Sequence, residues 1–393
     1  MSSNPSLVLH IGTEKTGTTA IQEFLRLNAN KYIDKGVVIP DYLGGAHSLF
    51  ACCFYSNQRQ DEISLAHKMN NAEARNRIRN ETLTRFKSQV SNAKTAKFII
   101  SSEHLHSRLT DELEIKELFE FASPLFDSIK IILYIRKPID AAISSWSTAV
   151  KYGVVSTSLP SPSDPYIHNN SMHKESILRW GKYFGETNVC VRLFRKDAFH
   201  QNNLIRDFTA SCDIDYSDDM ILPPKVNERL GYDGILFLSE INKQLPLVVN
   251  NELNPVRQNL HAYFEQHFRS SPPYIPSMEE VVEYADHFCH SDQWVKENYF
   301  NHLDSLWDDT NDSLMQPQVN EVNTEVDRDL DMTRKRYSRE EVSRLLSLFA
   351  QAWTDKHNRI IALESETSLK TEEIRILKNK IKAIANGIRD IKS

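Results

Sequence analysis

Short apolar runs alternate with longer amphipathic segments along the first half of the chain. The apolar runs at 7–11, 37–39, 98–101, 129–135 and 189–193 predict buried strands, and helical patterns follow most of them. Strands that are apolar throughout and alternate with helices are typical of a parallel sheet that helices cover on both faces. Ligands of such sheets bind beyond the carboxyl ends of the strands, so the residues that follow each strand are the first candidates for chemistry.

Three later segments depart from this alternation. Residues 154–165 (VVSTSLPSPSDP) combine three prolines with four serines and predict a loop. Residues 304–331 hold nine acidic residues with little apolar periodicity, which is typical of an acidic connector. The pattern therefore predicts an α/β domain over 1–303, a connector over 304–338 and a C-terminal helical extension over 339–393.

The C-terminal extension carries an apolar seam. Its apolar residues alternate steps of three and four: Ile374, Leu377, Ile381, Ile384, Ile388 and Ile391. The seam extends back through Leu363 and Ile360, with Thr367 and Lys370 as polar interruptions. Apolar a and d positions surrounded by Lys, Arg and Glu favour a coiled coil, so we expect a homo-oligomer. The alternative is a single amphipathic helix that packs on its own domain.

The composition narrows the class of protein. Hydrophobic residues make up 40% and charged residues 25% of the 393 residues, as in soluble globular proteins. The net charge of −6 disfavours a nucleic-acid binder. The five cysteines form no C-x-x-C pair, so we expect reduced thiols and no metal site. Without a signal peptide or a long apolar run, the sequence favours a cytoplasmic protein with no membrane span.

The stretch LVLHIGTEKTGTTAIQEFL, residues 7–25, reads as a strand, a tight loop and a helix. Gly12 and Gly17 have the spacing of a G-x-x-x-x-G-K-[ST] phosphate loop. Thr18 stands where that loop has its lysine, and Lys15 lies inside the loop. The backbone amides of such a loop still bind an anion, but an ATPase needs its lysine after the second glycine. The sequence therefore predicts a phosphate site and argues against an NTPase.

The segment KTGTT, from Lys15 to Thr19, resembles the phosphosulfate loop K-[ST]-G-T-[TS] of the sulfotransferases that use 3′-phosphoadenosine 5′-phosphosulfate (PAPS). The resemblance implies that Lys15 contacts the bridging oxygen of the donor and stabilises the leaving phosphate. It also implies that Thr16, Gly17, Thr18 and Thr19 bind the 5′-phosphate. The product would be adenosine 3′,5′-bisphosphate, and the reaction would require no metal.

A second match lies in YIRKPIDAAISSW, which resembles the 3′-phosphate motif of the same family, an arginine after a strand and a serine eight residues later. Here these residues are Arg136 and Ser144. An arginine at the carboxyl end of a buried strand suits bidentate phosphate recognition. Ala20 stands where small-molecule members have a Trp that stacks on adenine, so the adenine contacts stay unassigned. The resemblance covers about residues 7–197 and is nearer to bacterial and carbohydrate-type members, which implies a P-loop-type sheet and a saccharide acceptor.

Transfer to a hydroxyl also requires a base that takes the acceptor proton. Glu103 and His104 follow the apolar run KFIISS, and His47 follows the short strand at 37–39 and two glycines. Members of the family use Glu or His, so the resemblance leaves the choice open. We rank Glu103 first, His47 second and His104 third.

Two other classes of function fit parts of the sequence. A nucleotide kinase would share the loop and the sheet, and it would show magnesium-dependent turnover of ATP. A non-catalytic assembly protein would bind a nucleotide only as a structural ligand and would act through its heptad tail. It would transfer no sulfate despite binding the nucleotide.

We predict that the full-length chain is a dimer or a higher oligomer and that a variant ending near residue 354 is a monomer. A helix with an exposed apolar stripe gains stability when a second copy covers the stripe. Light scattering on both proteins at tens of micromolar measures the change. A monomeric full-length protein would refute the prediction, and a truncated protein that stays oligomeric would place the interface in the α/β domain.

Overall fold

The computed structural model confirms the predicted α/β architecture. It describes residues 5–56, 59–93, 96–224, 230–250, 252–257, 260–268, 272–307, 346–365, 367–368, 370–372 and 375. Five parallel strands form one sheet in the order β2-β3-β1-β4-β5. They are β1 (Ser6–His10), β2 (Val37–Val38), β3 (Lys97–Ser101), β4 (Ser128–Ile135) and β5 (Val189–Leu193). Each observed strand end lies within one residue of its predicted position.

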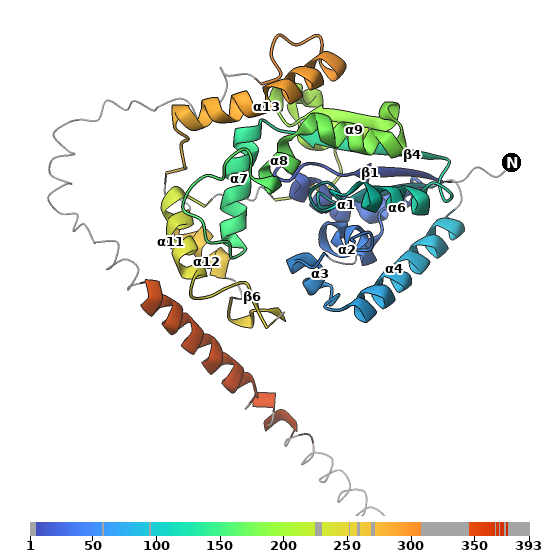
Figure 1. The fold of residues 1–393 in the computed structure, drawn as a ribbon. Helices are drawn as coiled ribbons and strands as arrows, with labels where there is room; N and C mark the ends of the chain where they lie inside the picture. The colour runs from blue at the N-terminus through green and yellow to red at the C-terminus, as the bar shows by residue number, and fades with distance from the viewer. Residues whose placement is uncertain are drawn as a thin grey trace, which may run out of the picture.

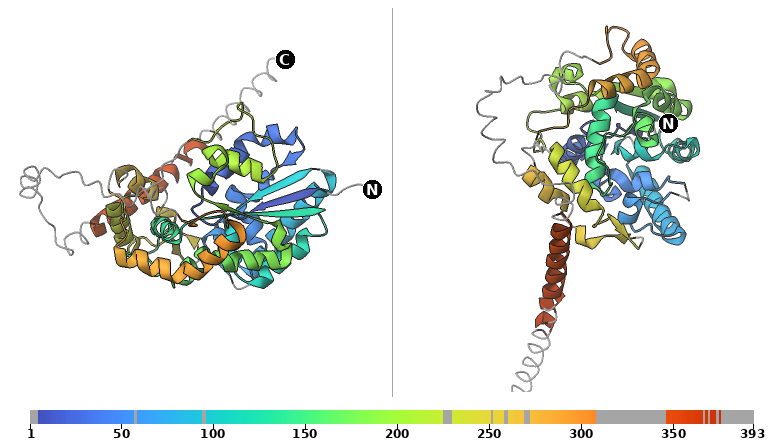
Figure 2. Two further views of the ribbon diagram at one scale, coloured as in Figure 1. Left: turned by 90° about the horizontal axis from the view of Figure 1, so that it is seen from above. Right: turned by 60° about the vertical axis from the view of Figure 1, so that its left-hand side comes forward.

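Helices connect the strands and cover both faces of the sheet (Figures 1 and 2). In the first half of the chain they are α1 (Thr18–Ile33), α2 (Ser48–Cys52), α3 (Glu62–Ala66), α4 (Ala72–Asn92), α5 (His104–Arg108), α6 (Glu112–Ala122) and α7 (Pro138–Lys151). Then follow α8 (Pro165–Ser171), α9 (His173–Phe184), α10 (Leu204–Ser211), α11 (Tyr232–Asn242), α12 (Leu260–Phe268) and α13 (Met278–Tyr299). A small hairpin pairs β6 (Val248–Val249) with β7 (Glu252–Leu253).

Alternate residues of the central strand β1 face two different hydrophobic cores. Leu7 and Leu9 point into a core that α2, α4, α6 and α9 complete. Val8 points into a second core, which contains Phe24 of α1 and Phe208 of α10. Because β1 is apolar on both faces, it is buried in the middle of the sheet and holds the loop that follows it on a rigid base.

A third core lies to one side of the sheet and is formed mainly by helices (Figure 1). It combines Trp146 of α7, Leu238 of α11, Phe264 of α12 and Phe288 of α13 with Ala350. The helical segment 346–365 begins in this core, where Trp353 Nε1 donates a hydrogen bond to the Val256 carbonyl. The beginning of the C-terminal extension thus packs on the α/β body. Most of the predicted connector and the seam from Ile374 to Ile391 lie outside the described residues.

A buried ion pair links β4, β5 and α10 behind the sheet. The Asp207 carboxylate is 1% exposed, accepts a 2.6 Å hydrogen bond from Tyr134 Oη and pairs with Arg192. Removing the Asp207 carboxylate would leave Arg192 and Tyr134 without their buried hydrogen-bond acceptor. The loss of folding free energy is therefore larger than for an exposed ion pair.

We therefore predict that Asp207→Ala lowers the free energy of unfolding by about 3–5 kcal/mol. Urea denaturation followed by circular dichroism measures the loss. The control is Asp218→Ala, which removes the 89%-exposed partner of Arg206 and is expected to cost less than about 1 kcal/mol. Equal losses of unfolding free energy in the two variants would show that the buried ion pair stabilises the protein no more than the exposed one.

Candidate functional site

The loop after β1 has the backbone shape of an anion-binding turn. Gly12 has φ of 34° and Gly17 has φ of 74°, both in the left-handed region that favours glycine. A Cβ at Gly17 would lie 2.4 Å from Leu204 Cδ2, so a larger residue there would also have to displace this side chain. Lys15 also has a positive φ, 68°, although it is not a glycine. Such a residue in a tight loop is a mark of a functional constraint.

The three threonines and the glycine at positions 16–19 differ in the hydrogen-bond donors that they offer to a ligand. Gly17 is the residue before α1, so the first amides of the helix face the loop. Thr16 Oγ1 donates a 2.6 Å hydrogen bond to the Thr13 carbonyl, so its proton is used within the loop. Thr18 is buried and Thr19 is exposed at the start of the helix. The backbone amides and the hydroxyls of Thr18 and Thr19 are therefore the donors that this loop offers to an anion.

Arg136 meets this loop because the loop begins as a continuation of the sheet. Beyond β1, the amides of Ile11 and Thr13 donate hydrogen bonds to carbonyls of β4. Arg136 follows β4, and its Nη1 donates to the Lys15 carbonyl at 3.1 Å. The sequence placed Arg136 and the loop at one sheet edge, and the structure brings them into contact. Ser144 lies on α7, partly buried, on the helix that begins two residues after Arg136.

Glu103 follows β3 on the other side of β1, where the Ser102 amide donates to the His10 carbonyl. Gln22 Nε2 donates to Glu103 Oε2 at 2.6 Å. Gln22 lies on α1, one turn after Thr18, so one helix carries both a loop hydroxyl and a partner of the carboxylate. Sequence reasoning missed Gln22, because nothing in its local sequence indicates which strand end it faces.

His47 is buried and hydrogen-bonded to the backbone. Its Nδ1 accepts from the Ser101 amide at 3.0 Å. Burial lowers the pKa of His47 to about 4, although a hydrogen bond to the Pro40 carbonyl opposes the shift. The imidazole is therefore neutral near pH 7, and it joins the loop after β2 to the end of β3.

Several buried polar atoms at the carboxyl ends of β1 and β3 lack partners among the described residues. They are His10 Nε2, Thr13 Oγ1, Ser102 Oγ and His104 Nδ1. Native structures rarely leave buried polar atoms without hydrogen bonds, and a bound ligand is a common source of the missing partner. These residues lie at the edge of the sheet that carries the loop, which fits a polar ligand there.

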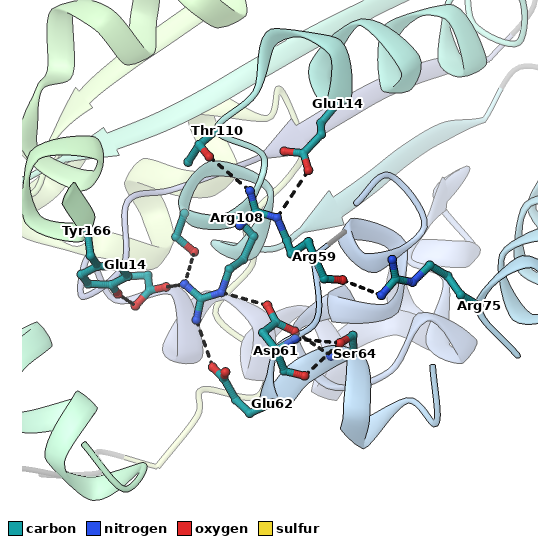
Figure 3. Close-up of polar contacts among 11 residues, drawn as sticks. Glu14, Arg59, Asp61, Glu62, Ser64, Arg75, Arg108, Thr110, Glu114 and Tyr166 are labelled. Carbon is teal, nitrogen blue, oxygen red and sulfur yellow. Dashed lines mark hydrogen bonds and ion pairs between the residues drawn. The ribbon is translucent and has the colours of Figure 1, made fainter. Parts of the chain in front are cut away.

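A polar network extends from the loop toward α3, α5 and α8 (Figure 3). Glu14, the residue before Lys15, points toward Arg108 and Tyr166. Its Oε1 lies 3.3 Å from Arg108 Nη1, and its Oε2 accepts a hydrogen bond from Tyr166 Oη. Arg108 also forms ion pairs with Asp61 and Glu62. The network was not foreseen from the sequence, because its members come from four separate segments.

No membrane-spanning or metal-binding feature occurs in the described part of the chain. None of the described helices has the length and apolar character needed to cross a membrane. Among the same residues, no group of three or more His, Cys, Asp or Glu side chains is placed to hold a metal ion. All five cysteines are described, and each is a free thiol.

No family model and no curated protein sequence matches the chain. Among solved structures, it is similar to one described as a sulfotransferase from Alicyclobacillus acidocaldarius, with 14% sequence identity. The likeness covers 72% of this chain and 95% of that chain, with a TM-score of 0.34. A TM-score this low does not carry fold or activity from one protein to the other, so the function has to be argued from the residues of the site.

Proposed function

We propose that the protein is a sulfotransferase that moves a sulfuryl group from PAPS to an acceptor hydroxyl. The resemblance of its motifs to carbohydrate-type members supports a carbohydrate as the acceptor. The observation that carries the proposal is the hydrogen bond from Arg136 to the Lys15 carbonyl. It joins the two segments that separately resemble the 5′- and 3′-phosphate motifs of the family. Residues 121 positions apart in the chain thus form one site.

The residues present fit a nucleotide with two phosphate groups. The amides of the loop and of the first turn of α1 would bind the 5′-phosphate, together with Thr16, Gly17, Thr18 and Thr19. Arg136 and Ser144 would bind the 3′-phosphate, with the guanidinium held 5.7 Å above the Phe194 ring. Buried atoms without partners, such as Thr13 Oγ1, support a polar ligand at this edge of the sheet.

Lys15 would stabilise the charge that develops when the bond between sulfur and the bridging phosphate oxygen breaks. A fixed cation at that oxygen acts mainly in the transition state, where the negative charge is largest. As the acceptor oxygen forms its bond to sulfur, the acceptor loses its proton to a base of the enzyme. The products are the sulfated acceptor and adenosine 3′,5′-bisphosphate.

The contacts of the candidate bases favour Glu103. Gln22 holds one of its oxygens, and no hydrogen bond to the other occurs among the described residues. His47 instead uses its Nδ1 for the Ser101 amide, and a neutral imidazole in that position has no free lone pair for a proton. His104 is the second choice on this geometry, because its Nδ1 is buried without a partner beside the loop.

We predict that adenosine 3′,5′-bisphosphate binds roughly 2–4 kcal/mol more tightly than AMP, because only the bisphosphate pairs with the Arg136 guanidinium. Isothermal titration calorimetry on the full-length protein measures both affinities. Arg136→Met is expected to remove most of the difference between the two affinities. AMP binding is expected to weaken by a smaller factor, because Arg136 Nη1 no longer holds the Lys15 carbonyl. The control, Arg206→Met, removes an arginine that pairs with Asp218 on the surface. Equal affinities for the two nucleotides in the wild-type protein would overturn the proposed function.

We predict that Glu103→Gln lowers the turnover number by about 10²-fold or more, because the amide cannot take the acceptor proton. Its affinity for the bisphosphate is expected to stay near that of the wild type, since the substitution keeps the shape of the side chain. Sulfate transfer from labelled PAPS to a panel of glycans measures turnover.

Two variants serve as comparisons for Glu103→Gln. Glu112→Gln changes an exposed carboxylate that pairs with Lys182 and is expected to keep full turnover. His47→Gln is expected to lower stability more than turnover. A loss of turnover in His47→Gln that exceeds the loss in Glu103→Gln would assign the base to His47.

A further inference from the structure

The phosphate loop contains a carboxylate, which is unfavourable for a site that binds an anion. Glu14 stands directly before Lys15. An ionised Glu14 repels phosphate groups at close range, and the repulsion is strong where water is excluded. The loop therefore requires a device that keeps this charge away from the ligand or neutralises it.

Figure 3 shows where the Glu14 side chain lies. Its two oxygens are held by different elements, one by Arg108 of α5 and the other by Tyr166 of α8. The carboxylate is mostly buried, with 12% of the side chain exposed. Burial by itself raises the pKa of Glu14, but Arg108 and then the hydrogen bonds from Tyr166 and Ser107 lower it below its ordinary value. Glu14 is therefore ionised in the folded protein.

Arg108 forms an ion pair with Glu14, and it is shared with two other carboxylates. Its Nε lies 3.3 Å from Asp61 Oδ2, and its Nη2 lies 3.1 Å from Glu62 Oε1. The guanidinium is 17% exposed and lies among three carboxylates. Without Arg108, the carboxylates of Glu14, Asp61 and Glu62 would lose the guanidinium that they share.

The loop backbone is held from both sides of Lys15. Glu14 anchors the residue before it to α5 and α8, and Arg136 binds the Lys15 carbonyl from the end of β4. The positive φ of Lys15 is unfavourable for a residue with a Cβ and persists only where the surroundings impose it. The two anchors supply such surroundings.

We propose that Arg108 is a positioning residue of the phosphate loop. It neutralises Glu14 and fixes the turn that presents Lys15 and the loop amides to the anionic donor, with Tyr166 as the second clamp on the same carboxylate. The inference rests on the proposed function, because it takes the loop to be the donor site.

The test compares Arg108→Met, Glu14→Gln and the double variant by calorimetry at about pH 8.5, where an unpaired carboxylate stays largely ionised. The probes are adenosine 3′,5′-bisphosphate and AMP. Arg108→Met is expected to weaken bisphosphate binding by about tenfold or more, and AMP binding by less, because repulsion from Glu14 grows with the charge of the ligand. Glu14→Gln is expected to bind within about threefold of the wild type. The double variant is expected to recover part of the affinity that Arg108→Met loses, because it removes the repulsion but does not restore the clamp on the turn.

Arg59→Met is the matched control, because Arg59 belongs to the same network but pairs with Glu114 and does not contact Glu14. The affinities of Arg59→Met for the bisphosphate and for AMP are expected to equal those of the wild type. If Arg108→Met does not fold, Tyr166→Phe is the alternative, because it removes one hydrogen bond to Glu14 without a change of charge. Loss of about one hydrogen bond is expected to weaken bisphosphate binding roughly two- to fivefold. This loss is expected to disappear when Tyr166→Phe is combined with Glu14→Gln.

The outcomes separate this inference from the proposed function. If the wild type binds the bisphosphate and Arg108→Met binds it equally well, Arg108 has no such role and the proposed function stands. A double variant no better than Arg108→Met, or equal losses for the two nucleotides, also overturns the inference, since a purely structural defect would not depend on ligand charge. If the wild type binds neither nucleotide, the proposed function fails and the inference fails with it.

Discussion

The pairing of β1 with both β3 and β4 is the constraint on which the site depends. Parallel pairing brings the carboxyl ends of all three strands to one edge of the sheet. Hydrogen bonds continue past the strand ends, from Thr13 to β4 and from Ser102 to His10. Backbone hydrogen bonds therefore fix the loop after β1 between the end of β4, where Arg136 lies, and the end of β3, where Glu103 lies.

Burial keeps two histidines near the loop after β1 uncharged. His10 and His173 are fully buried, and burial lowers the pKa of His10 to about 3 and that of His173 to about 4. Both rings stay neutral near pH 7 and act through hydrogen bonds, His173 to the Arg136 carbonyl and His10 to Ser101. Neither imidazole then adds positive charge beside the loop, and the arginines there keep their charge near pH 7.

The helical core beside the sheet contributes to the site through α7 and α8. Ser144 lies on α7, and Tyr166 of α8 holds Glu14. Trp146 on α7 packs in the same core as Phe264 of α12 and Ala350 of the C-terminal extension. Residues late in the chain therefore pack in the same core as α7 and α8. The division into an α/β domain and a separate extension remains a prediction.

The sequence by itself determined the strands, the loop and the residues that follow each strand. These features depend on local causes: apolar runs long enough for buried strands, glycines where φ is positive, and Arg136 and Glu103 at strand ends. Only the tertiary structure decided which side chains face each other. Gln22 reaches Glu103, 81 residues away, because α1 packs beside β3. His47 binds the Ser101 amide, and Glu14 finds Arg108 and Tyr166, because strand order and helix packing bring distant segments together, and no local pattern encodes that order.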